Sequence, residues 1–170
     1  VGSDGFQGDR PESAGEFQRD SYAGYVDLET DLNEWLTLAA AGRFEDLEGF
    51  DSNFDWKVSA RAQVMDSLAL RATVNTGFRA PTPGQINTTD VTTASDLDGT
   101  LIPLGTFGIN TPAARALGAQ PLETEESFNV SVGLVFEPLD NFTLTVDYYN
   151  IDIDDRIVLN TTLIEPGSPE

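Results

Sequence analysis

The chain has 170 residues, enough for one domain with a sizeable core. Its 29 acidic and 9 basic residues give a formal net charge of −20. This charge argues against nucleic-acid binding, which needs a basic surface, and disfavours attachment to anionic lipid. The chain contains no Cys and no His, so disulfides, thiolate metal sites and the commonest general base are excluded. We therefore expect no enzymatic activity and no obligatory cofactor.

Membrane insertion has to be judged from strands, because no stretch approaches the ~20 apolar residues of a membrane helix and no signal peptide is recognisable at the start. Transmembrane β-strands alternate apolar and polar residues and give only a weak hydropathy signal. The membrane is therefore not excluded by composition.

Alternating apolar and polar residues dominate the chain and predict an all-β protein. The clearest run extends from Phe54 to Val64. In the last run the apolar positions move from Tyr148 to Tyr149, which predicts a β-bulge at that pair. Strands are predicted at about 21–31, 35–45, 54–65, 68–78, 127–137 and 142–155, with a further short candidate around 157–159.

The predicted connections alternate in length. Residues 31–34, 65–67 and 137–141 form tight links, whereas 46–53 is longer and 79–125 is very long. A connection of that length without secondary structure argues against an ordinary compact domain. Short turns on one side and long loops on the other are typical of an outer-membrane β-barrel. Within the long connection, residues 109–120 predict a short helix with Thr111 as its cap and Pro112 at its first position.

Two architectures fit alternating strands. In a soluble sandwich the apolar face is the core, and in a large barrel it faces lipid while the polar face lines the lumen. Aromatic residues near strand ends favour the barrel, because such residues form girdles at the membrane interfaces, although core-edge aromatics would give the same pattern. These aromatics are Trp35, Phe44, Phe54, Phe78, Phe136 and Phe142.

The segment "NTGFRAPTPGQIN" (75–87) resembles the barrel of TonB-dependent outer-membrane receptors, in which a strand ending in Gly-Phe-Arg-Ala-Pro leads into a large outer loop. The segments 19–46, 57–74, 117–134 and 133–158 resemble the same family in a consistent order. The resemblance implies a 22-stranded barrel with an N-terminal plug that takes up siderophores, cobalamin or oligosaccharides with energy from TonB. It also implies that 79–125 is an extracellular loop, entered through Gly77, Phe78, Arg79, Ala80 and Pro81.

The chain departs from this family in three respects. It shows no plug-like region, no energy-coupling box and no terminal aromatic residue, and it ends in "EPGSPE". We therefore expect residues 1–170 to be an internal piece of the barrel, an antiparallel up-and-down set of strands without the plug. Its expected partners are outer-membrane lipid, the remaining barrel and the plug, with TonB reached only through the missing plug.

Four cations are candidates for lining the lumen, where they would pair with plug carboxylates or an anionic substrate. The preferred alternative is that they offset nearby Asp27, Glu29, Glu45 and Asp55. The four cations are Arg43, Lys57, Arg61 and Arg71.

Calcium is a weaker candidate. "DLDGT" (96–100) and "NIDIDD" (150–155) offer carboxylates at short spacing, but neither matches the EF-hand pattern. The carboxylates concerned are Asp96, Asp98, Asp152 and Asp154.

Two functions remain open. The first is a segment of a receptor in the bacterial outer membrane, for active uptake of a scarce nutrient. The second is an extracellular structural protein, in which free strand edges associate with one another into a fibre.

Overall fold

The computed structural model describes residues 16–95 and 98–158, which divide into two compact units. One unit is the sheet formed by residues 20–80 and 124–156, and the other comprises the connection 81–123 with the flanking residues 16–19 and 157–158. The sheet contains β1 (Ser21–Asn33), β2 (Leu36–Leu47), β3 (Asn53–Met65), β4 (Leu68–Arg79), β7 (Glu125–Leu139) and β8 (Phe142–Asp154).

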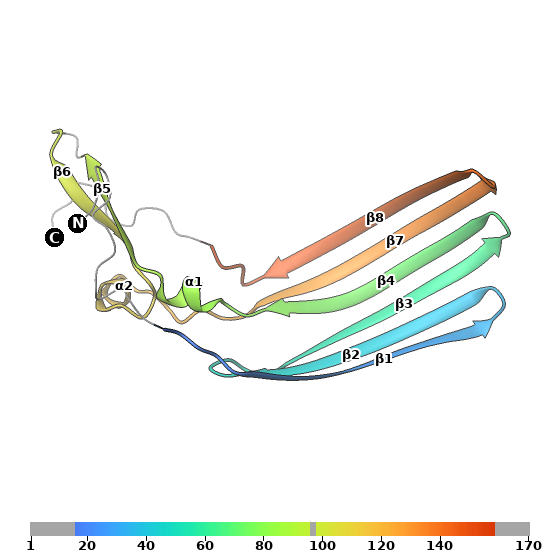
Figure 1. Ribbon diagram of the computed structural model, residues 1–170, viewed down its shortest axis with the longest axis horizontal. Coiled ribbons are helices and arrows are strands. Elements are labelled where there is room, and N and C mark those ends of the chain that lie inside the picture. The colour runs from blue at the N-terminus through green and yellow to red at the C-terminus, as the bar shows by residue number, and fades with distance from the viewer. Residues whose placement is uncertain (1–15, 96–97, 159–170) are drawn as a thin grey trace. The chain divides into compact units, whose positions relative to one another are not determined.

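The six strands lie in the order β1-β2-β3-β4-β7-β8, and every neighbouring pair is antiparallel (Figure 1). Strands β4 and β7 pair directly although residues 80–124 separate them in the sequence. This confirms the predicted up-and-down arrangement. The sheet is open, because within the described residues the outer edges of β1 and β8 pair with no other strand.

Tight turns join the strands at one end of the sheet, at residues 34–35, 66–67 and 140–141. None of these turn residues has a positive φ, so the primed turns typical of hairpins are excluded. Instead, each hairpin has a register shift just before its turn, at Asp31/Asn33, Gln63/Met65 and Phe136/Leu139. An extra residue on the first strand increases the local right-handed twist, which the unprimed turn does not supply.

The β-bulge predicted at Tyr148–Tyr149 is wrong. Tyr148 pairs with Val132, Tyr149 pairs with Ser131, and the register continues without a shift to Asp154. The strand keeps its register, and what changes is the kind of residue that each face carries. Beyond Tyr148 the formerly apolar side carries polar residues, and the opposite side becomes apolar.

The turns are staggered across the sheet in a way that defines the strand tilt. Leu36, the first residue of β2, lies in register with Leu70, two residues into β4, and with Val146, four residues into β8. The stagger is therefore one residue for each strand. With a rise of about 3.3 Å per residue and about 4.8 Å between strands, it corresponds to a tilt of about 35°. Membrane barrels have strands tilted by about 35–45°.

The long connection has more regular structure than the sequence pattern predicted. It contains the hairpin of β5 (Asp90–Ser95) and β6 (Leu101–Thr106), and the short helices α1 (Pro83–Asn87) and α2 (Pro112–Ala116). Helix α2 has the predicted Thr111 cap and early Pro. The prediction of a connection without strands is wrong, because β5 is rich in Thr and Ser and does not show the expected alternation.

No strand is assigned to residues 157–158, so the described part of the candidate seventh strand is not one, and residue 159 lies outside the described residues. Among the described residues, none of the helices has the length and apolar character needed to span a membrane.

Candidate functional site: the two faces of the sheet

The sheet has one apolar face, and the side chains on it are exposed or half-buried. Val26 is 61% exposed, Val58 50% and Val146 52%. A contiguous apolar surface of this extent requires an apolar environment or a partner. Strand alternation and register place the following residues on this apolar face: Tyr22, Val26, Leu28, Leu36, Leu38, Phe44, Phe54, Trp56, Val58, Leu68, Leu70, Val74, Phe78, Phe128, Val130, Val132, Leu134, Phe136, Leu144, Val146 and Tyr148.

The soluble sandwich is not what the sheet unit adopts. Leu47 and Ala69 are its buried hydrophobic residues, and both lie on the opposite, polar face. The apolar face therefore does not form the core of the sheet unit.

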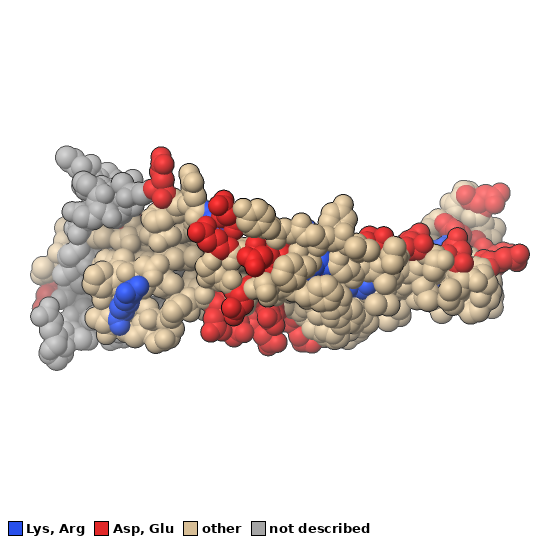
Figure 2. Space-filling model, turned by 90° about the horizontal axis from the view of Figure 1, so that it is seen from below, with Lys and Arg blue, Asp and Glu red and all other residues tan. Residues whose placement is uncertain are grey.

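Aromatic residues lie at both ends of the strands. Trp35 (54% exposed) and Phe142 (48%) lie at the tight turns, while Phe44 (51%) and Phe54 (61%) lie near the other end. Acidic side chains are also concentrated toward the two ends of the strands, as Figure 2 shows. Aromatic belts bordering an apolar band, with charges beyond them, are the arrangement that a bilayer selects.

The four predicted cations all lie on the polar face of the sheet. Arg43 pairs with Glu45 on the same strand at 2.6 Å, which confirms the predicted charge compensation for this pair. The polar face also carries Tyr25, Asp27, Glu29, Asp55, Thr73, Asn75, Asn129, Ser131 and Asp147.

Arg71 makes a bidentate pair that the sequence analysis missed. Its Nε donates to Oδ1 of Asp147 at 3.0 Å, and its Nη2 donates to Oδ2 at 2.7 Å. The two residues belong to β4 and β8, and Gly133 of β7 lies in register between them. A Cβ at Gly133 would overlap Oδ1 of Asp147, so the glycine provides the space for this pair.

Arg61 and Lys57 have no ion-pair partner within the part of the chain that the structure describes. Arg61 lies directly opposite Arg71 in the β3–β4 register. The predicted compensation therefore does not extend to these two residues.

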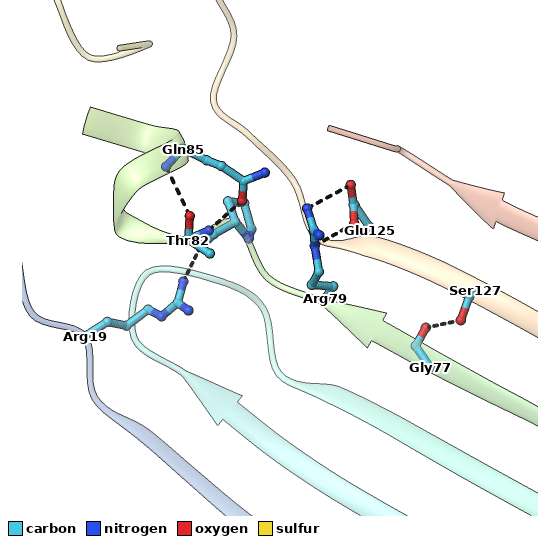
Figure 3. A network of polar contacts seen from close by, with 8 residues as sticks. Arg19, Gly77, Arg79, Thr82, Gln85, Glu125 and Ser127 are labelled. Atoms are coloured by element: carbon cyan, nitrogen blue, oxygen red, sulfur yellow. Dashed lines mark hydrogen bonds and ion pairs between the residues drawn. The ribbon is translucent and has the colours of Figure 1, made fainter. Parts of the chain in front are cut away.

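The strand-end motif lies where β4 ends and the long connection begins. Arg79 pairs with Glu125 of β7, with 2.8 Å between Nε and Oε2, and Ser127 Oγ donates to the carbonyl oxygen of Gly77 at 3.2 Å (Figure 3). Phe78 is half-buried and lies on the apolar face. These contacts tie the last residues of β4 to β7.

The residues after this strand end are held by their own contacts. Pro81 is fully buried, and its carbonyl oxygen accepts a hydrogen bond from Arg19 Nη1 at 2.6 Å. Thr82 and Gln85 form a reciprocal capping box at the start of α1, in which Thr82 Oγ1 accepts from the Gln85 N–H and Gln85 Oε1 accepts from the Thr82 N–H (Figure 3). Such a capping box satisfies two backbone N–H groups that would otherwise lack a partner at the start of the helix.

Strands β3 and β4 separate toward the end where the long connection begins (Figure 1). Their pairing ends at Lys57 and Asn75, and beyond it the Trp56 N–H donates to Thr76 Oγ1 at 3.1 Å. Thr76 Oγ1 in turn donates to Asp55 Oδ1 at 3.2 Å. An open depression of about 400 Å³ lies here, and its lining includes Tyr25, Asp27, Arg43, Asp55, Lys57 and Asn75.

The calcium candidates are not gathered into one cluster among the described residues, in which no three acidic side chains converge as a metal site would require. Asp152 accepts a hydrogen bond from Asn150 at 2.9 Å, and Asp154 lies on the same side of β8. Asp98 is exposed, and Asp96 lies outside the described residues. Calcium binding stays a prediction.

A family model described as TonB dependent receptor-like, beta-barrel, matches residues 2–169 of the chain. Among solved structures, the chain is similar to the siderophore receptor PirA from Acinetobacter baumannii, with a TM-score of 0.62 and 16% sequence identity. The match covers 81% of this chain and 18% of that receptor, and at this identity it shows the fold alone. No curated protein matches the chain.

Proposed function

The chain belongs to the TonB-dependent receptor β-barrel family, and from this premise we propose that it forms part of the wall of an outer-membrane receptor that actively takes up a scarce nutrient. The observation that carries the proposal is the open six-stranded sheet, with one continuous apolar face and one polar face crossed by ion pairs. Receptors of this family are transporters rather than enzymes, in agreement with the absence of Cys and His from the chain.

Each surface of the sheet then has its own partner. The apolar face contacts lipid of the bacterial outer membrane, because exposed Val, Leu and aromatic side chains are stable there and not in water. The free edges of β1 and β8 pair with further barrel strands, since unpaired backbone groups within a bilayer each cost several kcal/mol. The polar face lines the lumen and meets the plug, through which TonB acts.

The lengths of the connections indicate how the strands are oriented in the membrane. The tight turns at 34–35, 66–67 and 140–141 lie on the periplasmic side, and the connection 80–124 lies outside the cell. Gly77 to Pro81 then mark the outer end of a wall strand, as the resemblance implied.

The nutrient is a siderophore, cobalamin or an oligosaccharide, and siderophores should be tested first because PirA is a siderophore receptor. A strain that lacks the complete receptor gene is compared with the parent strain and with a complemented strain. Each is grown with one nutrient class as the limiting supply. Growth that needs both the receptor and TonB supports the proposal. Growth that is independent of the receptor on all three classes contradicts it.

A second candidate is edge-to-edge self-association, favoured by one observation, the two 13-residue edge strands β1 and β8, in which every residue is exposed. Denatured mass separates the two candidates. A native polypeptide several times larger than 18.4 kDa supports the receptor, whereas one near 18.4 kDa that assembles without detergent supports the fibre.

A further inference from the structure

The polar face of the sheet contains a block without charged side chains, where β4, β7 and β8 run side by side. The block spans three successive rows of the strand register on that face, and every residue in these rows of the three strands is uncharged. We call this block the uncharged patch. Its residues are Thr73, Asn75 and Gly77 of β4, Ser127, Asn129 and Ser131 of β7, and Tyr149, Ile151 and Ile153 of β8.

Ion pairs occupy the rows on either side of the uncharged patch. On the row nearer the long connection, Arg79 Nε lies 2.8 Å from Glu125 Oε2. On the row nearer the tight turns, Arg71 Nη2 lies 2.7 Å from Asp147 Oδ2. Each of these cations is held by a carboxylate of the same sheet, so neither row offers an uncompensated charge to a ligand.

A further cation borders the uncharged patch toward β3. Lys57 lies opposite Asn75 in the register. Asp55 carries the opposite charge at the next position on the same face of β3. The border therefore has no excess of positive charge. A ligand with several negative charges would lose its hydration here without gaining cationic partners.

The side of the uncharged patch that β8 forms is apolar. Tyr149, Ile151 and Ile153 are exposed although they lie on the polar face, because β8 exchanges the polarity of its two faces beyond Tyr148. The patch residues of β4 and β7 are half-buried, and most of them are small. The result is an apolar ridge beside a lower floor of hydroxyl and amide groups. Ligand sites combine apolar contact area with a few oriented polar groups in this way.

The floor of the patch contains hydrogen-bond acceptors that the sheet does not use. Asn75 and Asn129 lie opposite one another. The side-chain amide of Asn75 donates to the Thr76 carbonyl oxygen at 3.2 Å, and that of Asn129 donates to Ser127 Oγ at 3.2 Å. Within the described part of the chain, Oδ1 of neither asparagine accepts a hydrogen bond. These two half-buried oxygens can accept hydrogen bonds from the hydroxyl groups of a ligand.

The uncharged patch lies toward the outer end of the strands and is elongated along β8. Tyr149 is seven residues from Phe142, where β8 begins, and Ile153 precedes the last residue of the strand. At about 3.3 Å per residue, the ridge starts about 23 Å from the tight turn and is about 13 Å long. In the orientation proposed above, a solute that enters from outside the cell reaches this part of the wall early. A long, narrow ridge suits a chain of rings better than a compact complex.

We propose that the uncharged patch binds an uncharged oligosaccharide. The apolar C–H faces of the sugar rings lie on Tyr149 and Ile151, and their hydroxyl groups donate to Asn75 and Asn129. Tyrosine suits this contact, since its ring combines a large apolar surface with a polar hydroxyl. The inference rests on the proposed function and selects one of its three nutrient classes. The similarity to PirA does not decide the class, because at 16% identity it shows the fold alone.

The first experiment measures binding to the complete receptor, purified in detergent, by isothermal titration calorimetry. The probes are maltohexaose, cellohexaose and xylohexaose, with cyanocobalamin and a ferric tris-catecholate representing the other nutrient classes. We expect at least one oligosaccharide to bind, and Tyr149→Ala to weaken its binding about tenfold. Tyr148→Ala is the matched control, because Tyr148 is as exposed as Tyr149 (68% and 70%) but lies on the apolar face.

Three outcomes of this titration would overturn the inference. The first is that none of the three oligosaccharides binds. The second is equal weakening in Tyr148→Ala and Tyr149→Ala. The third is that cyanocobalamin or the ferric tris-catecholate binds in place of the oligosaccharides and depends on Tyr149.

A second variant tests the polar floor of the patch. Asn129→Ala should weaken binding of the same oligosaccharide about fivefold, because one hydrogen bond to the ligand is lost. Thr145→Ala is the control, since Thr145 lies on the same face of β8 but nearer the tight turn, and its affinity should equal that of the wild type. An unchanged affinity in Asn129→Ala would contradict the proposed acceptor.

The third experiment locates the ligand by hydroxyl-radical footprinting of the two neighbouring tyrosines. With saturating oligosaccharide, oxidation of Tyr149 should fall severalfold while oxidation of Tyr148 stays the same. Equal protection of both tyrosines, or none at Tyr149, would overturn the inference.

These readouts are independent of transport. A receptor that binds an oligosaccharide through Tyr149 but takes up no nutrient contradicts the proposed uptake and leaves this inference standing. A receptor that takes up a siderophore or cobalamin and binds no oligosaccharide has the opposite meaning.

Discussion

The two faces of the sheet differ in where their side chains find partners. On the apolar face, Val26, Val58 and Val146 remain at least half exposed, and nothing in the sheet unit covers them. On the polar face, side chains contact one another across the strands, and Arg71 reaches past a complete strand to Asp147. The apolar face therefore depends on its surroundings for stability. The contacts on the polar face depend instead on which residues the strand register places side by side. The same difference ranks the substitutions by their expected effect.

The largest effect should come from a charge on the apolar face. Val58→Arg in the complete receptor should reduce the free energy of unfolding in lipid vesicles by about 2–4 kcal/mol, as expected for a cation near the bilayer midplane. Ser59→Arg, on the adjacent position of β3 and on the polar face, should cost much less. Urea titration of the vesicle-inserted receptor measures both values. Equal losses would mean that the faces are assigned incorrectly.

A methyl group on the polar face should have the next largest effect. Gly133→Ala should reduce the free energy of unfolding by about 1–3 kcal/mol, because its Cβ would overlap Asp147 and separate it from Arg71. Gly24→Ala, on the apolar face of β1, is the control for an added methyl group without overlap, since its Cβ would meet no atom within 4 Å. The same urea titration applies. Restoration of stability by Asp147→Ala in the Gly133→Ala background would identify the overlap as the cause.

A substitution of Thr76 tests the boundary between the two faces. This residue lies on the apolar face, yet its hydroxyl group forms hydrogen bonds with the Trp56 N–H and the Asp55 carboxylate. Thr76→Val keeps the shape of the side chain and removes the hydroxyl. We expect a loss of about 0.5–1.5 kcal/mol, together with faster amide exchange at Trp56. Thr73→Val on the same strand serves as the control. Unchanged exchange at Trp56 would contradict the bridging role of Thr76.

The smallest effect should come from an exposed pair within one strand. Arg43→Gln should change stability by about 0–1 kcal/mol, because the Arg43–Glu45 pair is partly solvated and is screened by salt. A double-mutant cycle with Glu45→Gln, at low and high salt, isolates the pair. A coupling well above this range would mean that the polar face is shielded from water to a greater degree than the exposure of Arg43 indicates.

Much of the fold could be predicted from the sequence, because period-two alternation is a local signal. Runs such as Phe54 to Val64 gave the strands and their two faces, and the positions of the tight links gave the order of pairing. The β5–β6 hairpin was missed because its residues do not alternate. The bulge at Tyr148–Tyr149 was inferred from a change of parity, but the structure shows that the faces change composition while the pairing continues.

The candidate site was predictable only in part. Alternation placed Arg43, Lys57, Arg61 and Arg71 on the polar face, but it could not show which carboxylate each would meet. Asp147 lies 76 residues from Arg71 in the sequence, and it becomes a partner because β7 lies between their strands and has a glycine at that register. The sequence did contain a signal, since Gly133 interrupts the alternation of polar and apolar residues in β7. That the glycine makes room for an ion pair could be seen only once the strand pairing was known.

The sequence by itself determined that this protein consists of strands with an apolar and a polar face, because alternation depends on residues two positions apart, and the tight links between the strands made neighbouring strands antiparallel. Only the tertiary structure decided the one-residue stagger of the turns, the pairing of β4 with β7 across 45 intervening residues, and the contact between Arg71 and Asp147. These features depend on register between distant segments. A shift of one residue would move every side chain of a strand to the other face, so register is fixed by all strands together and is not encoded in any one of them.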